Sequence, residues 1–218
     1  MIDYFPPHTP GTMTIADHVA LHSAAVNLGH EFHGIYGPET IERFLHESYK
    51  QLAVAGGVPT FLPLLAERFS RQRLHALARI EGHHRDRRPV VLFVCAHNAG
   101  RSQMALGFFT RLARDNAVAC SGGSEPGPLL NPFAVAAMAE RGINIRGAYP
   151  KPWTDEVVGA ADVVITMGCG DACPVFAGIH YENWDVRDPA DLDIQDVRRI
   201  RDDIERRVFR LLSDLKIP

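Results

Sequence analysis

The spacing of apolar residues predicts helices in the first part of the 218-residue chain and alternating strands and helices in the rest. Apolar side chains recur every three or four residues over 15–33, 38–55 and 61–80, as they do in amphipathic helices. Gly34 ends the first of these segments, and Pro38 begins the second. Three helices with short joints predict a small all-α three-helix bundle, which we place in residues 1–88.

From residue 89 to residue 218 the pattern is typical of an α/β domain. Short apolar runs at 90–95, 117–121, 162–167 and 179–183 have the composition of strands, and helical spacing lies between them and over 194–215. Strands that alternate with helices form parallel sheets, so we expect a four-stranded parallel sheet with helices on both faces. Ligands of such sheets bind beside the carboxyl ends of the strands.

The end of the first strand carries the strongest chemical signal. Cys95 ends the run VVLFVC, and Arg101 and Ser102 complete a C-x5-R-S pattern where a helix begins. A loop between a strand end and a helix N-terminus directs several backbone N–H groups at one point, where they can bind an oxyanion. We expect this oxyanion-binding loop to consist of Ala96, His97, Asn98, Ala99, Gly100 and Arg101.

In this setting Cys95 is a candidate nucleophile. The helix N-terminus and the Arg101 guanidinium both favour the thiolate over the thiol. Arg101 can also hold two oxygens of a tetrahedral oxyanion, and Ser102 can form a hydrogen bond with the sulfur. The leaving oxygen needs a proton, for which Asp188, followed by Pro189, is the candidate acid and Asp185 the alternative.

We expect different roles for the other three cysteines. Cys169 and Cys173 lie in MGCGDACP after the third strand, where either can act as a resolving thiol that forms a disulfide with Cys95. No second Cys or His pair completes a zinc-binding spacing, so we expect no metal site; the combination of Cys169, Cys173 and His180 stays open. Cys120, near the end of the second strand, is interpreted as a packed residue.

Composition narrows the classes of partner. The 23 basic and 26 acidic residues nearly balance, and no helix of the bundle has a basic stripe, so we expect no nucleic-acid partner; a DNA-binding helix-turn-helix is the less favoured alternative for the bundle. No apolar run approaches the ~20 residues of a membrane span, and the N-terminus lacks the features of a signal peptide. We therefore expect a cytoplasmic protein with no membrane contact. The small bundle predicts a homodimer, because it buries little apolar surface alone.

The segment CAHNAGRSQMA, Cys95 to Ala105, resembles the anion loop of the low-molecular-weight phosphatase superfamily, and in particular of its arsenate reductase branch. Gln103 stands where the phosphatases usually carry proline. The segments SGGSEP, NPFAVAAMAERGI, KPWTDEV, ADVVITMGCGDACP and NWDVRDPA resemble actinobacterial arsenate–mycothiol transferases. The superfamily also places its acid in an aspartate-proline pair late in the chain, as Asp188-Pro189 does here.

The resemblance implies an arsenate reductase or arsenate–thiol transferase in which phosphate and sulfate mimic the substrate. Cys95 would be the nucleophile, Asn98 and Arg101 would shape the loop, Ser102 would stabilise the thiolate and Asp188 would be the acid. No cofactor is expected to bind tightly. The reductant would be mycothiol with a mycoredoxin or glutaredoxin-like protein, or thioredoxin. A protein tyrosine phosphatase and a non-catalytic oxyanion or redox sensor are the alternatives.

Overall fold

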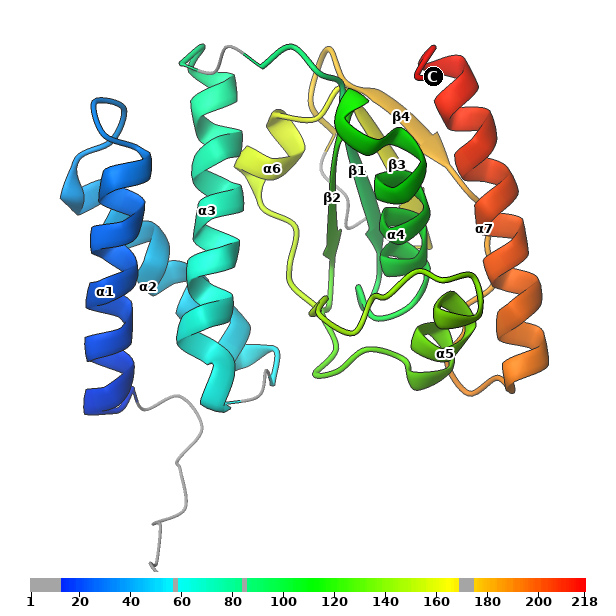
Figure 1. Cartoon of the computed structure of the whole chain (residues 1–218), viewed down its shortest axis with the longest axis horizontal. Coiled ribbons are helices and arrows are strands. Elements are labelled where there is room, and N and C mark those ends of the chain that lie inside the picture. The colour runs from blue at the N-terminus through cyan, green and yellow to red at the C-terminus, as the bar shows by residue number, and fades with distance from the viewer. Residues whose placement is uncertain (1–12, 57–58, 84–85, 169–174) are drawn as a thin grey trace, which may run out of the picture. The chain divides into compact units, whose positions relative to one another are not determined.

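The computed structural model describes residues 13–56, 59–83, 86–168 and 175–218 (Figure 1). Its contacts divide the chain into two compact units, Met1–Arg71 and Gln72–Pro218. The division falls within helix α3 (Leu62–Ile80). The domain boundary that we infer from the sequence, between residues 88 and 89, stays a prediction.

The first unit is helical, as the spacing of its apolar residues predicts. It contains α1 (Ile15–Glu31), α2 (Pro38–Val54), the 3-10 turn η1 (Pro59–Phe61) and the first part of α3. Thr14 begins α1 through a capping box, in which its hydroxyl accepts from the backbone N–H of Asp17 and the Asp17 carboxylate accepts from the backbone N–H of Thr14. The buried core residues of the helices are Leu21, Ala24, Leu28, Ile41, Phe44, Leu45, Tyr49, Leu52, Leu62, Ala66 and Phe69.

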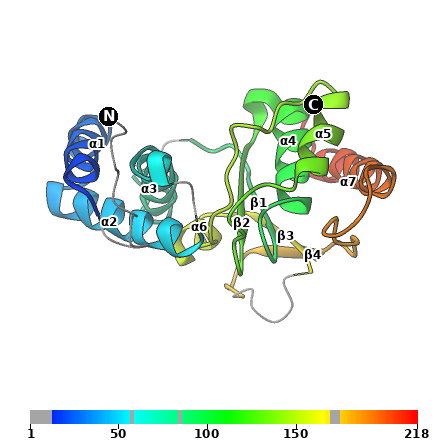
Figure 2. The ribbon, with the colours of Figure 1, turned by 90° about the horizontal axis from the view of Figure 1, so that it is seen from below.

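The second unit contains the expected four-stranded parallel sheet. Its strands are β1 (Val90–Cys95), β2 (Val118–Gly123), β3 (Val163–Met167) and β4 (His180–Asn183), in the order β2-β1-β3-β4. The connecting elements are α4 (Arg101–Ala113), the 3-10 turn η2 (Arg114–Asn116), α5 (Pro132–Glu140), α6 (Asp155–Gly159) and α7 (Ile194–Asp214). Figure 2 shows α4, α5 and α7 together on one side of the strands.

Side chains of β1 alternate between two buried layers. Phe93 and Cys95 pack in the larger core beneath α4, α5 and α7, where Phe93 contacts Trp184 with ring centroids 5.9 Å apart. Leu92 and Val94 point to the other face and pack against Val157 of α6. Because both faces of the sheet are covered, the whole of β1 is buried, which explains its uninterrupted apolar sequence.

Strand β2 extends beyond its expected end at Ser121. Gly122 and Gly123, which lie beyond the expected strand 117–121, pair with Val94 and Cys95 of β1. A Cβ at Gly122 would lie 2.8 Å from the backbone of Trp153, so glycine is needed there for close approach and not for a turn. The carboxyl ends of β1 and β2 therefore finish side by side.

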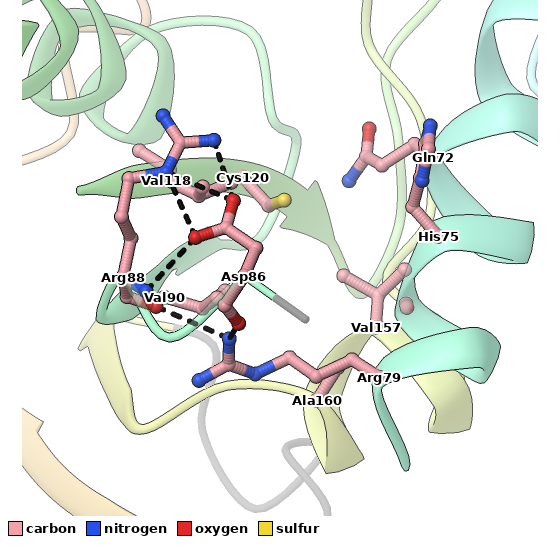
Figure 3. Close-up of a pocket in the computed structure, with 12 residues that line it drawn as sticks. Gln72, His75, Arg79, Asp86, Arg88, Val90, Val118, Cys120, Val157 and Ala160 are labelled. Atoms are coloured by element: carbon pink, nitrogen blue, oxygen red, sulfur yellow. Dashed lines mark hydrogen bonds and ion pairs between the residues drawn. The ribbon is translucent and has the colours of Figure 1, made fainter. Parts of the chain in front are cut away.

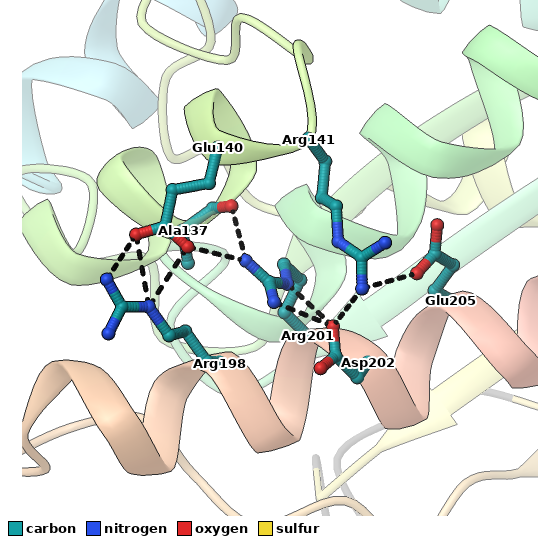
Figure 4. A network of polar contacts seen from close by, with 7 residues as sticks. All are labelled: Ala137, Glu140, Arg141, Arg198, Arg201, Asp202 and Glu205. Atoms are coloured by element: carbon teal, nitrogen blue, oxygen red, sulfur yellow. Dashed lines mark hydrogen bonds and ion pairs between the residues drawn. The ribbon is translucent and has the colours of Figure 1, made fainter.

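Ion pairs join α5 to α7 (Figure 4). Glu140 at the end of α5 accepts from Arg198 at 2.5 Å and from the buried Arg201 at 2.8 Å, and Arg141 pairs with Asp202 at 2.7 Å. Arg201 also donates to the carbonyl of Ala137, which fixes the last turn of α5 against α7. Within the described ranges, every helix is too short or too polar to span a membrane.

This arrangement predicts a pH-dependent contribution of Glu140 to stability. Hydrogen bonds, first from Arg198 and then from Arg201, lower the pKa of Glu140 from 4.5 to about 2. A carboxyl whose pKa is lower in the folded state stabilises the fold above pH 4.5, and this contribution is lost as the pH falls towards 2. We expect Glu140→Gln to lower the melting temperature by about 1–3 °C at pH 7 and by less at pH 3.

Melting curves of both proteins from pH 7 to pH 3 measure this effect. Asp214→Asn, on the exposed last turn of α7, is the control in the same unit. An effect of Glu140→Gln that stays constant over this range would contradict the prediction.

Candidate active site

The loop after β1 is held from outside by its carbonyl groups. The carbonyls of Cys95, Ala96, His97 and Ala99 accept backbone hydrogen bonds of 2.9–3.3 Å from the N–H groups of Ser124, Glu125, Gly127 and Asn131, respectively. The two other carbonyls of the loop are also bonded. The Asn98 carbonyl accepts from the Gln103 side chain, and the Gly100 carbonyl accepts from the N–H of Met104. In a trans peptide the N–H points away from the preceding carbonyl. The N–H groups of residues 96–101 therefore face the interior of the loop, as an oxyanion site requires.

Ser102 links this loop to the sulfur of Cys95. The Ser102 Oγ lies 3.0 Å from the Cys95 Sγ and accepts a hydrogen bond of 2.8 Å from the Asn98 Nδ2. Because Asn98 is the donor in that bond, the Ser102 hydroxyl has its own hydrogen to donate to sulfur. The hydroxyl is thus placed to donate to a nucleophilic Cys95 sulfur.

Asn98 holds the loop in a conformation that few residues adopt. Its φ is +48°, in the left-handed region, and its side chain is buried. The Asn98 Oδ1 accepts from the backbone N–H of Lys151 and from the Gln103 Nε2, both at 3.0 Å. These two bonds fix the amide so that its Nδ2 points at Ser102.

Arg101 begins α4 and is buried next to Asp188. One terminal nitrogen of its guanidinium pairs with the Asp188 Oδ2, and the other donates to the carbonyl of Val186 at 3.3 Å. Gly168, at a φ of +71°, also lies close to the guanidinium, since a Cβ there would stand 2.8 Å from the Arg101 Nη1. The guanidinium is thus positioned by the segments that follow β3 and β4.

A small cavity of about 50 Å³ opens at this point, a size suited to an inorganic oxyanion. Cys95, Arg101 and Asp188 all line it. Asp188 is partly exposed, and its Oδ1 accepts from the N–H of Ala190 at 3.0 Å, which orients the carboxyl towards the cavity. The alternative acid, Asp185, is exposed and does not line the cavity.

The loop and the segment that carries Asp188 contact each other tightly. A Cβ at Gly100 would lie 2.6 Å from Pro189 Cγ, so only glycine leaves room for this proline. Asn131 adds a second link, because its backbone N–H donates to Ala99 and its side chain donates to the carbonyl of Pro189 at 3.2 Å. Nucleophile loop and candidate acid thus form one packed assembly.

The structure brings together most residues that the sequence singled out. Six of them line the cavity, namely Cys95, His97, Ala99, Gly100, Arg101 and Asp188. Cys169 and Cys173 lie outside the described residues. Within the described part of the chain, no cluster of three or more His, Cys, Asp or Glu side chains is arranged to hold a metal ion.

Three supporting residues were not predicted as parts of the site. Asn131 caps α5, where its Oδ1 accepts from the backbone N–H of Ala134 at 2.9 Å, and it also contacts the loop. Gln103 and Lys151 reach the loop through Asn98. Their contacts bridge distant parts of the chain, and no local sequence signal reveals such contacts.

Cys120 lies away from this site. It is paired with Leu92 in the sheet and packs in the layer of α6, whereas Cys95 packs in the layer of α4. Cys120 is a free cysteine, and burial raises the pKa of its thiol despite the opposing charge of Lys151. Cys120 is therefore separated from Cys95 by the sheet.

Two families match successive parts of the chain. The family described as "Protein-tyrosine-phosphatase-like, N-terminal domain" matches residues 21–78, and "Low molecular weight phosphotyrosine protein phosphatase" matches residues 90–217. Among solved structures, the Corynebacterium glutamicum thioredoxin-dependent arsenate reductase superposes with a TM-score of 0.82 at 41% identity, covering 90% of this chain and 96% of the other.

Curated relatives match the second part of the chain. A putative arsenate reductase of Halobacterium salinarum is 32% identical over 127 residues, which are 56% of this chain and 89% of the relative. A glutaredoxin arsenate reductase of Synechocystis is 35% identical over 129 residues, which are 57% of this chain and 97% of the relative.

Proposed function

Since the chain belongs to the low molecular weight phosphotyrosine protein phosphatase family, and the relatives described above are arsenate reductases, we propose that this enzyme reduces arsenate to arsenite through Cys95. The observation that carries this proposal is the Cys95 sulfur beside Ser102, at a loop whose N–H groups face inward. The expected fold and the expected resemblance are both confirmed.

The geometry supports a two-stage reaction. Arsenate binds to the N–H groups of residues 96–101, with the Arg101 fork taking two of its oxygens. The Cys95 thiolate then attacks arsenic and forms an As–S bond, and an arsenic-bound hydroxyl takes a proton from Asp188 and leaves as water. A second thiol loses its proton to solvent, attacks the Cys95 sulfur as a thiolate and forms a disulfide. The electron pair of the As–S bond passes to arsenic, which leaves as arsenite.

We propose Cys169 or Cys173 as the second thiol, with thioredoxin reducing the resulting disulfide. The C. glutamicum enzyme, described as thioredoxin-dependent, supports this choice. Mycothiol with a mycoredoxin is the alternative. Arsenite release measured with a thioredoxin system in one assay, and with mycothiol and mycoredoxin in another, separates the two. Thiol chemistry of this kind needs a reducing compartment, which supports a cytoplasmic location.

Asp188→Asn is expected to lower kcat for arsenate reduction about 100-fold, because an amide cannot give a proton to the leaving oxygen. Asp185→Asn is the matched control, since Asp185 lies three residues earlier, is exposed and does not line the cavity. Steady-state arsenite release measures both variants. Equal rates for Asp188→Asn and the unchanged enzyme would remove Asp188 from the mechanism.

One observation supports the alternative function of a phosphatase: the N–H groups of residues 96–101 would hold phosphate as well as arsenate. It predicts fast hydrolysis of an aryl phosphate such as p-nitrophenyl phosphate. A reductase instead shows arsenite release that far exceeds this hydrolysis at equal substrate concentration.

We further propose that the helical unit joins two copies of the chain. Ile15, Val19 and Val26 of α1 are 84%, 63% and 48% exposed, and their spacing places them along one side of the helix. Such an apolar stripe is suited to pairing with a second copy. Light scattering is expected to give twice the 24.1 kDa of one chain, and Val19→Asp should shift it towards the monomer. A monomeric unchanged protein would contradict this.

A further inference from the structure

A second cavity lies on the α6 side of the sheet in the unit Gln72–Pro218. Its volume is about 440 Å³, within the range of small-molecule sites, and Figure 3 shows the residues around it. It lies between the second half of α3, strand β2, helix α6 and the segment before β1. Because Cys120 lines it while Cys95 packs on the other face, the sheet separates it from the oxyanion site.

The walls of this cavity are mainly apolar. Val90 and Val118 come from the first residues of β1 and β2, Val157 and Ala160 come from α6 and the residue after it, and Ala76 comes from α3. These side chains can contact an aliphatic or aromatic group from three sides. Walls of this kind bind ligands largely through burial of apolar surface.

The side-chain amide of Gln72 is the polar group of this wall that a ligand can bind. The Gln72 Nε2 is a buried donor that has no oxygen or nitrogen partner among the described residues; its one neighbouring acceptor is the Cys120 sulfur, whose thiolate it favours. In Figure 3 the Gln72 amide and the Cys120 sulfur face each other, and sulfur is only a weak acceptor. A carbonyl or ether oxygen placed between them would satisfy the Gln72 donor.

The charged residues at the rim are already paired with each other. Arg79 donates to the Asp162 carboxylate at 2.8 Å and to the carbonyls of Asp86 and Arg88. Arg88 in turn pairs with the Asp86 carboxylate at 2.6 Å. The two guanidinium groups are therefore matched by two carboxylates, and the rim does not select for a charged ligand.

We propose that this cavity is a binding site for an uncharged, mainly apolar small molecule whose one hydrogen-bond acceptor is held by Gln72. The site is independent of the proposed arsenate chemistry. Its ligand would be an aromatic or short aliphatic compound with a single carbonyl or ether group.

Prodan tests this proposal directly, because it is a neutral naphthalene with one carbonyl and its emission shifts to the blue in apolar surroundings. We expect one prodan to bind per chain, with a dissociation constant of about 10–100 μM. Bound prodan should slow alkylation of Cys120 by N-ethylmaleimide at pH 8.5 at least fivefold, as followed by peptide mass spectrometry. Arsenite release, measured in parallel, tests the activity of the oxyanion site. Failure of the proposed ligand binding can therefore be distinguished from failure of the proposed arsenate reduction.

Two variants separate the cavity from general apolar adsorption. Ala76→Leu fills the cavity and should weaken prodan binding at least tenfold, whereas Ala139→Leu, on the exposed side of α5, should leave it unchanged. Gln72→Met removes the donor at similar volume and should weaken binding about fivefold. The proposal is overturned if prodan does not bind, if Ala76→Leu binds it as well as the control does, or if Cys120 is alkylated at the same rate with and without prodan.

Discussion

Arsenite release is expected to fall about 10⁴-fold or more in Cys95→Ser, to the rate without enzyme. Serine keeps the shape of the side chain and its contact with Ser102, which lies 3.0 Å from the sulfur. A hydroxyl is far less acidic than a thiol, however, and it cannot form the disulfide that carries two electrons to arsenic. The variant should still bind phosphate, since the N–H groups of residues 96–101 are unchanged.

Cys120→Ala provides the matched control, because it removes a cysteine from the same sheet but on its other face. We expect its rate of arsenite release to stay within about twofold of the unchanged enzyme. Isothermal titration with phosphate shows whether Cys95→Ser keeps its fold and its loop. Substantial turnover by Cys95→Ser would place the nucleophile elsewhere.

Arg101→Lys is expected to lower kcat/KM for arsenate by about 10²–10³-fold. Lysine keeps the positive charge, but it lacks the planar fork that can bind two oxygens and also contact both Asp188 and the Val186 carbonyl. A point charge at this position cannot align the oxyanion with the sulfur and the acid at the same time.

Arg111→Lys is the control on the same helix, where the arginine is exposed and donates to the carbonyl of Gly142 at 2.8 Å. It should change kcat/KM by less than twofold. If Arg101→Lys and Arg111→Lys gave equal rates, charge alone would suffice and the fork would have no role in the reaction.

The sequence predicts those parts of the site that are local in the chain. The apolar run of β1, the five residues between Cys95 and Arg101, and the helix that begins beside Ser102 form one continuous segment, so hydrophobic spacing and turn chemistry define it. Asn131 is also predictable as a cap, because a cap depends on the next three residues.

The rest depends on contacts between segments far apart in the chain. Nothing in the sequence around Asn131 indicates that its backbone holds Ala99, and nothing around Lys151 indicates that its N–H fixes Asn98. The extension of β2 through Gly122 depends in the same way on the approach of Trp153. Register and loop packing decide these features, and hydrophobic spacing does not encode them.

The contact between Gly100 and Pro189 limits how this enzyme can be altered. The nucleophile loop and the aspartate-proline segment lie almost ninety residues apart in sequence, yet the 2.6 Å approach leaves no room for even a methyl group between them. Transplanting the C-x5-R-S stretch alone into another parallel-sheet protein would therefore not transfer catalysis. The proline-bearing turn would have to be moved with it, as a single graft.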